Sequence, residues 1–196
     1  MGEDSDWGKL GALEKLNRLY LAIISRYRDY IEEHENISLA ELPALVTPKN
    51  GAVIAKVDEI KSSFERYDYE KNFREAGTAA FEFVRGKVDD IVLPLQFWLA
   101  PEETLAFMIG DTLDRCTLLC SMLIALGNPS SKVAVVMKGD SRRIFVHCEL
   151  DGSVYMFDLG DGIRRFAAKR ELVASLNIDK DTTAYEFNDI TQTDIG

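Results

Sequence analysis

Residue types that could carry out covalent chemistry gather in the stretch GDTLDRCTLLC, residues 110–120. Cys116 and Cys120 lie there, within a segment that is apolar nearly all round below its first turn and therefore predicts a buried helix over 112–126. A helix start is where an enzyme places a reactive thiolate, because the positive end of the helix dipole lowers the pKa of a thiol. In this chain that position holds Thr112. The stretch indicates either an enzyme whose nucleophile has moved along the helix or a domain that has lost it.

A histidine and an aspartate come later, on either side of a predicted hairpin turn at Asp151-Gly152. A two-residue turn places His147 opposite Met156, and Asp158 then lies on the same face, diagonal to His147 and about 7 Å away at the backbone. A histidine that an aspartate orients is the base of many nucleophilic enzymes. A turn with one more residue would shift the register and send Asp158 to the other face. Without a catalytic role, His147 would be a half-buried strand histidine.

Helices are predicted before these residues and antiparallel strands around them, which favours an α+β fold. Apolar residues recur at helical spacing over 5–34 and in further segments up to residue 90. After the buried helix come predicted strands at 132–138, 143–150 and 153–159 and a short helix near 168–176.

These elements suggest how the chain is organised. We expect a helical N-terminal region over 1–90 and a polar C-terminal tail over 177–196. Between them, residues 91–176 are expected to form a core in which the central helix packs on a small antiparallel sheet. The whole length suits one compact domain.

The composition limits partners and compartment. The formal net charge is -10, which argues against a nucleic-acid partner, because affinity for phosphates depends on Lys and Arg. No apolar run approaches the roughly 20 residues of a membrane span, so no membrane partner is expected. The acidic N-terminus differs from a signal peptide, and the three cysteines have no framework spacing, which favours a reduced, cytoplasmic protein. We expect neither a metal nor another cofactor.

The region around the central helix resembles transglutaminase-like proteins, which share the papain-like cysteine protease fold. Their pattern is a Trp and Pro-Glu, then Gly-Asp-Cys-x-Asp, then small residues and leucines that end in Leu-Gly, followed by a His and an Asp on the next strands. The resemblance covers roughly residues 91 to 162. The matching residues are Trp98, Pro101, Glu102, Gly110, Asp111, Asp114, Leu118, Leu119, Leu126, Gly127, His147 and Asp158.

The departure from this pattern is the nucleophile. The resemblance implies a Cys-His-Asp triad, which here becomes Thr112, His147 and Asp158. A threonine hydroxyl is far less acidic than a thiol, and nucleophilic threonines use a chain-terminal amine that Thr112 lacks. Threonine at a helix start is a good capping residue, so we expect Thr112 to cap the helix. These points favour a non-catalytic member, a pseudoenzyme, with vestigial triad positions.

A relocated thiol is the alternative and would make the chain an active cysteine-type hydrolase or acyl transferase. Cys116 lies about 6 Å along the helix axis from position 112, where the dipole effect has faded. Buried cysteines there would act as small apolar side chains. Cys148 follows His147 and therefore points to the opposite face of its strand.

The resemblance also suggests a cleft beside the central helix that binds a peptide or protein segment. Trp98, Asp111 and Asp114 are the candidate binding residues there, although Trp98 could equally be a core anchor. A third hypothesis makes the helical N-terminal half the interaction surface. The oligomeric state stays open.

Overall fold

The computed structural model describes residues 3–34, 39–92 and 97–195, so positions 1–2, 35–38, 93–96 and 196 of the predicted regions lie outside the described residues. The chain divides into two units, one of residues 1–36 with 93–97 and the other of residues 37–92 with 98–196. In the first unit, the predicted helix over 5–34 is two helices, α1 (Glu3–Arg26) and α2 (Arg28–His34). The helical bonding continues through Tyr27, whose carbonyl accepts from the N–H of Ile31 at 3.0 Å.

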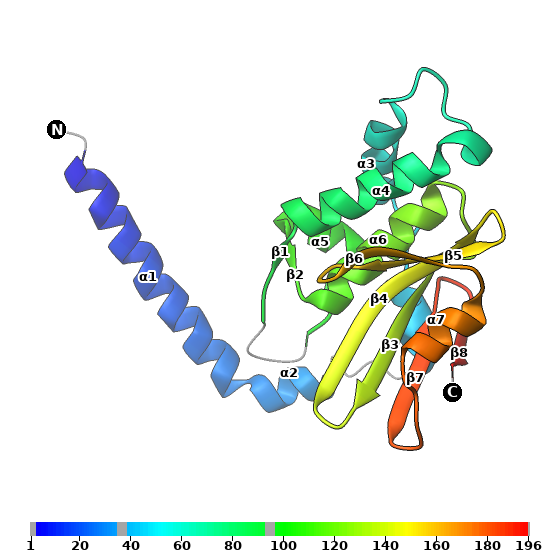
Figure 1. Ribbon diagram of the computed structural model, residues 1–196. Helices are drawn as coiled ribbons and strands as arrows, with labels where there is room; N and C mark the ends of the chain where they lie inside the picture. The colour runs from blue at the N-terminus through cyan, green and yellow to red at the C-terminus, as the bar shows by residue number, and fades with distance from the viewer. Residues whose placement is uncertain (1–2, 35–38, 93–96, 196) are drawn as a thin grey trace. The chain divides into compact units, whose positions relative to one another are not determined.

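The second unit is built on a six-stranded sheet with the order β6-β5-β4-β3-β7-β8 (Figure 1). Every neighbouring pair in it is antiparallel. The strands are β3 (Lys132–Lys138), β4 (Ser141–Leu150), β5 (Ser153–Asp158), β6 (Gly162–Phe166), β7 (Thr182–Phe187) and β8 (Gln192–Asp194). The predicted polar tail over 177–196 is thus corrected, because β7 pairs with β3 inside the sheet.

Helices flank this sheet. They are η1 (Leu39–Leu45), α3 (Gly51–Lys61), α4 (Tyr69–Lys87), α5 (Pro101–Phe107), α6 (Thr112–Ala125) and α7 (Lys169–Ser175). A short parallel pair, β1 (Asp89–Asp90) with β2 (Ile109–Gly110), lies apart from the main sheet. The predictions of the central helix, three strands and the short helix after them are confirmed. None of the helices in the described ranges is long and apolar enough to span a bilayer.

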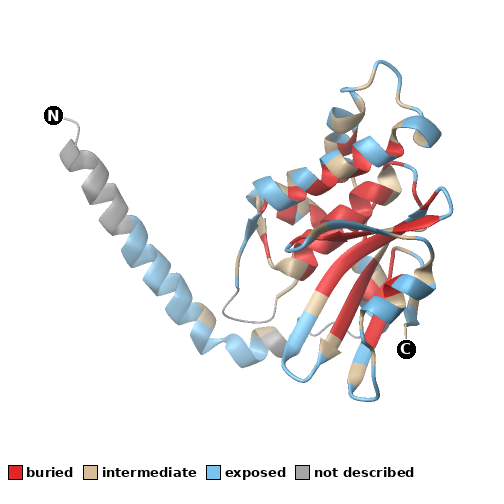
Figure 2. Ribbon diagram, viewed as in Figure 1, coloured by how far each residue is buried: buried red, intermediate tan, exposed pale blue. Residues whose placement is uncertain are grey.

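The two faces of the sheet bury different cores. One face carries Val133, Ile144, Val146, Cys148 and Phe157 against α3, α4 and α6. The other carries Ala134, Phe145 and Met156 with Leu172 of α7. Figure 2 shows buried residues along α6, β3 and β4. Helices in the first part and an antiparallel sheet after them give the α+β fold, with a papain-like core.

The β4–β5 hairpin has the register that a two-residue turn requires. Asp151 and Gly152 have φ values of 51° and 70°, and positive φ at both positions defines a type I′ turn. His147 therefore lies opposite Met156, as predicted. By alternation, His147 and Asp158 point to the α7 face, because Val146 and Phe157 point to the α6 face.

Candidate functional site

The start of α6 is held by a reciprocal pair of aspartates. Asp111 is the N-cap, and its Oδ1 accepts hydrogen bonds from the backbone N–H groups of Leu113 at 2.7 Å and Asp114 at 2.9 Å. Asp114 returns the contact, since its Oδ2 accepts from the N–H of Asp111 at 3.0 Å. This arrangement is a capping box. Thr112 is the first helical residue and not the cap, which corrects the sequence prediction.

Asp114 also ties the preceding segment to the helix. It is 1% exposed, and its Oδ1 accepts from the backbone N–H of Leu99 at 3.0 Å. Burial, followed by the negative charge of Asp111, raises the pKa of Asp114 to about 6. Gly110 packs closely here, because a Cβ atom at that position would lie 2.9 Å from the Cβ of Asp114. Both aspartates proposed as binding residues thus have structural contacts that hold the helix start.

The three cysteines are in the interior. Cys116, Cys120 and Cys148 each have an exposed fraction of 0%. Burial raises the pKa of Cys116 and Cys120 well above the usual value, and it raises the pKa of Cys148 to about 12. All three thiols are therefore protonated near neutral pH and enclosed by apolar side chains.

Asp158 is paired with an arginine. Its Oδ2 accepts from Arg143 Nη2 at 2.8 Å and from Nε at 3.0 Å, and its Oδ1 accepts from the N–H groups of Gly160 and Asp161, each at 3.0 Å. Burial acts to raise the pKa of Asp158, but the Asp161 N–H and the Arg143 guanidinium outweigh it and hold this pKa below its usual range. Asp158 is therefore a stable anion that bonds to a permanent cation.

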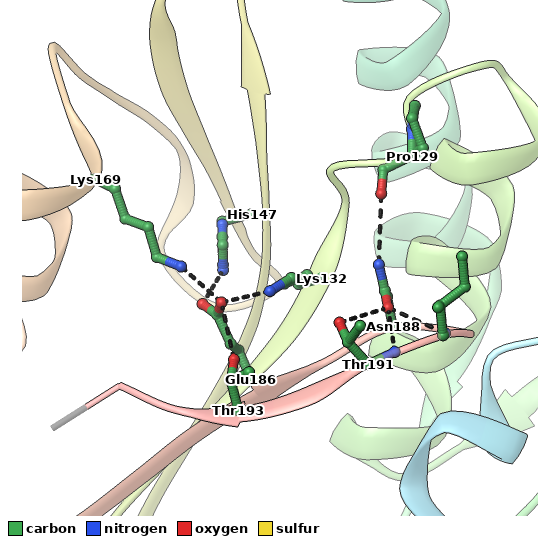
Figure 3. Close-up of polar contacts among 9 residues, drawn as sticks. Pro129, Lys132, His147, Lys169, Glu186, Asn188, Thr191 and Thr193 are labelled. Carbon is green, nitrogen blue, oxygen red and sulfur yellow. Dashed lines mark hydrogen bonds and ion pairs between the residues drawn. The ribbon is translucent and has the colours of Figure 1, made fainter.

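His147 has a different acidic partner, Glu186 of β7 (Figure 3). Its Nε2 lies 3.0 Å from Glu186 Oε2, and the two residues are 3% and 2% exposed. Lys132 and Lys169 donate to Glu186 Oε1 at 2.7 and 2.6 Å. Burial acts to raise the pKa of Glu186, but hydrogen bonds from His147 and the two lysines lower it overall. This network joins β3, β4, β7 and the start of α7.

Thr112 and His147 are separated by the sheet and along the length of α6. Thr112 begins α6, which packs on one face of the sheet, whereas the His147 side chain points to the other face. The start of α6 is near the first residues of β4, where Arg142 Nη2 lies 4.0 Å from Asp111 Oδ2. Its far end is near the last residues of β4, where the side-chain amide of Asn128 donates to the Glu149 carbonyl at 2.9 Å. His147 is thus level with the end of α6 and faces away from it. The expected Thr112-His147-Asp158 arrangement is not assembled.

Trp98 packs against the core on the α6 face and is partly buried. Its indole Nε1 is buried without a hydrogen-bond partner among the described residues. This position agrees with a core anchor.

Two residues of this region were not singled out from the sequence, Arg143 and Glu186. A signal for Arg143 existed, since the hairpin register places Phe145 opposite Asp158 and so makes both His147 and Arg143 diagonal neighbours of that aspartate. No comparable signal existed for Glu186, because its strand reads as part of a polar tail. In the ranges that the structure describes, no cluster of three or more His, Cys, Asp or Glu side chains could hold a metal ion.

Comparisons with known proteins identify a fold. No family model matches the chain, and no curated protein does. Calcium-bound LapG of Legionella pneumophila is similar in structure, with a TM-score of 0.52 and 14% identity over 81% of this chain and 88% of that one. The chain shares the fold of LapG. EGTA-treated LapG matches with the same TM-score of 0.52 and 13% identity over 82% of this chain and 87% of that one.

This fold is of the transglutaminase-like cysteine protease type. The resemblance first seen around the central helix is therefore supported at the level of the fold. At such identity the likeness concerns the fold alone, and the chemistry of this chain depends on its own residues.

Proposed function

We propose that this chain is a non-catalytic transglutaminase-like domain, a pseudoenzyme, that binds an extended peptide or protein segment. The observation that carries the proposal is the pairing of Asp158 with Arg143. The aspartate of a Cys-His-Asp enzyme orients a base, and a guanidinium cannot accept a proton in a protein. With Asp158 bonded to Arg143 and not to His147, the contact that orients the base of such an enzyme is missing, which supports a loss of catalysis.

The nucleophile gives a second line of support. Position 112, at the helix start, holds a hydroxyl, and the base expected to activate it is bound to Glu186 instead. Cys116, the alternative nucleophile, is fully buried and its pKa is raised. A hydrolase or acyl transferase based on that thiol is thus disfavoured.

Binding is supported by concave surfaces of suitable size. A hollow of about 350 Å³ lies between α4 and the β4–β6 strands, and another of about 620 Å³ lies beside the β4–β5 turn. Ligand sites commonly have volumes of about 300 to 1,000 Å³. The net charge of -10 makes a protein segment a better partner than a nucleic acid or an anionic membrane. Three unpaired cysteines suit a reducing compartment such as the cytoplasm.

Thiol reactivity tests the loss of catalysis. We expect iodoacetamide to leave all three cysteines of the folded protein unlabelled between about pH 5 and pH 9, and to label all three after denaturation. Mass spectrometry of tryptic peptides locates the labels. Rapid labelling of one cysteine near neutral pH, slowed by Asp158→Asn, would overturn the proposal and identify an enzyme with a relocated nucleophile.

A further inference from the structure

The smaller hollow has an apolar floor and a basic rim. Phe73 of α4, Tyr155 of β5 and Ile163 of β6 are among its apolar lining residues. Arg74 and Arg165 stand on its two sides, one on α4 and the other on β6. None of the described residues that line this hollow is an Asp or Glu. The hollow is thus locally positive, whereas the chain as a whole has a net charge of -10.

The charges of these two arginines are not neutralised within the described part of the chain. Arg165 donates from Nε at 3.1 Å and from Nη2 at 2.9 Å to the hydroxyl of Ser153, a neutral acceptor. Arg74 forms no ion pair with another described residue. Two guanidinium groups without carboxylate partners attract an anionic ligand, and guanidinium geometry matches a carboxylate.

The same hollow borders an open edge of the sheet. β6 is the terminal strand, paired only with β5 among the described strands, and Ile163, Arg164 and Arg165 are exposed. A terminal strand presents backbone N–H and C=O groups that a further strand can pair with. An extended segment that pairs with β6 would direct alternate side chains toward the face that holds the hollow.

We infer that β6 and the hollow together form a binding site for an extended acidic segment of a partner protein. The segment adds as a strand beside Gly162–Phe166. A carboxylate of the segment binds Arg74 and Arg165, and an apolar side chain two residues along, on the same face of the segment, occupies the floor beside Ile163. This inference rests on the proposed binding function and assigns it to a surface other than the start of α6.

Blocked, fluorescein-labelled peptides of about six residues test the site by fluorescence anisotropy on the full chain. We expect the peptide Glu-Thr-Val-Thr-Glu-Thr, which directs glutamate and valine to the same face, to bind, and its counterpart with lysine in place of glutamate to fail. The double substitution Arg74→Gln with Arg165→Gln should weaken binding about tenfold or more, because charge-assisted bonds are lost. Arg170→Gln on α7 is the matched control, since it removes an exposed arginine outside the hollow and should leave the affinity unchanged.

Backbone pairing is tested on the ligand, which avoids any effect on folding. Methylation of the glutamate peptide at alternate amide nitrogens should abolish binding, and hydrogen exchange should slow at Gly162–Phe166 when the unmodified peptide binds. Equal affinity for the methylated peptide would show that the peptide backbone does not pair with β6. Tight binding of the small carboxylate 3-phenylpropionate with no protection of β6 would show a small-molecule site. Either result would overturn the inference.

Failure of this site can be distinguished from failure of the proposed function. Peptide binding that protects the start of α6, and that the double substitution leaves unchanged, overturns the β6 site alone. If none of these peptides binds and the cysteines are unreactive, the β6 site is overturned but the proposed loss of catalysis still holds. Rapid thiol labelling overturns the proposed function whichever surface binds.

Discussion

Arg143 lies against Asp158 across the β4–β5 hairpin, with Nη2 2.8 Å from Oδ2, whereas His147, the other diagonal neighbour of Asp158, bonds to Glu186. The two diagonal positions are equivalent in the ladder, so side-chain chemistry decides between them. The guanidinium offers Asp158 two donors, Nε and Nη2. The imidazole is buried beside a carboxylate that two lysines also contact. The hairpin is thereby stabilised by an ion pair where a Cys-His-Asp enzyme has an orienting acid and its base.

The Arg143–Asp158 pair should stabilise the fold with a defined pH dependence. The pKa of Asp158 is lowered in the folded chain, so its contribution is present above the unfolded pKa of about 3.9 and is lost as the pH falls through the folded pKa. Urea unfolding should show Asp158→Asn less stable than the parent at neutral pH, by about 1 kcal/mol since Arg143 is partly exposed, with the difference shrinking below about pH 4. Arg142→Gln, at a looser 4.0 Å contact, is the control and should change stability by less than about 0.5 kcal/mol. A difference that grows on acidification would contradict the assignment.

A thiol introduced at the helix start should not be activated by His147. The variant Thr112→Cys places a thiol at the first residue of α6, whereas His147 faces the other side of the sheet. We expect its iodoacetamide rate to be the same in the presence and absence of His147→Gln. The parent gives no background, since its three thiols are buried. A large fall in rate with His147→Gln would mean that the two positions meet in solution.

Asp114 should titrate near pH 6 and weaken the fold as it ionises. Its pKa is raised by burial and by Asp111, so the folded state binds its proton more tightly than the unfolded state does. Stability from this group is therefore fully present below about pH 4 and falls as the pH rises toward 6. Asp111→Asn keeps a capping side chain but removes the neighbouring charge, so the pKa of Asp114 should fall. NMR titration of the Asp114 carboxyl measures both values, and an unchanged pKa in Asp111→Asn would remove the proposed coupling.

Glu186 should be among the residues most costly to neutralise. It is 2% exposed and bonds to Lys132, Lys169 and His147, so Glu186→Gln leaves two partly exposed lysines without their anion and the buried His147 without its carboxylate partner. We expect a loss of about 1.5 to 3 kcal/mol in the free energy of unfolding at neutral pH. Glu149→Gln makes the same chemical change at an exposed position of β4 and should cost little. Equal losses for the two variants would show that the network does not stabilise the chain.

The sequence by itself determined the elements around the central helix and the register of the hairpin. The apolar run over 112–126 and the alternation in 132–159 are local patterns, and each residue in them depends on near neighbours. The turn Asp151-Gly152 fixes the pairing because positive φ at both positions selects a two-residue loop. The local pattern also placed Thr112 at the start of that helix.

Only the tertiary structure decided what those residues contact. The sequence pattern allowed either of the two residues diagonal to Asp158, His147 or Arg143, to be its partner. In the folded chain His147 bonds to Glu186, which lies in β7, a strand distant in the sequence that pairs with β3, so Asp158 bonds to Arg143. Polar residues in 182–194 show no local strand signal, because that pairing is stabilised by contacts with strands formed much earlier in the sequence. Packing also decided which face of the sheet α6 covers. Because His147 points to the other face, the sheet separates it from Thr112. Register is a local property, whereas the identity of a side chain's partner depends on how all the layers pack together.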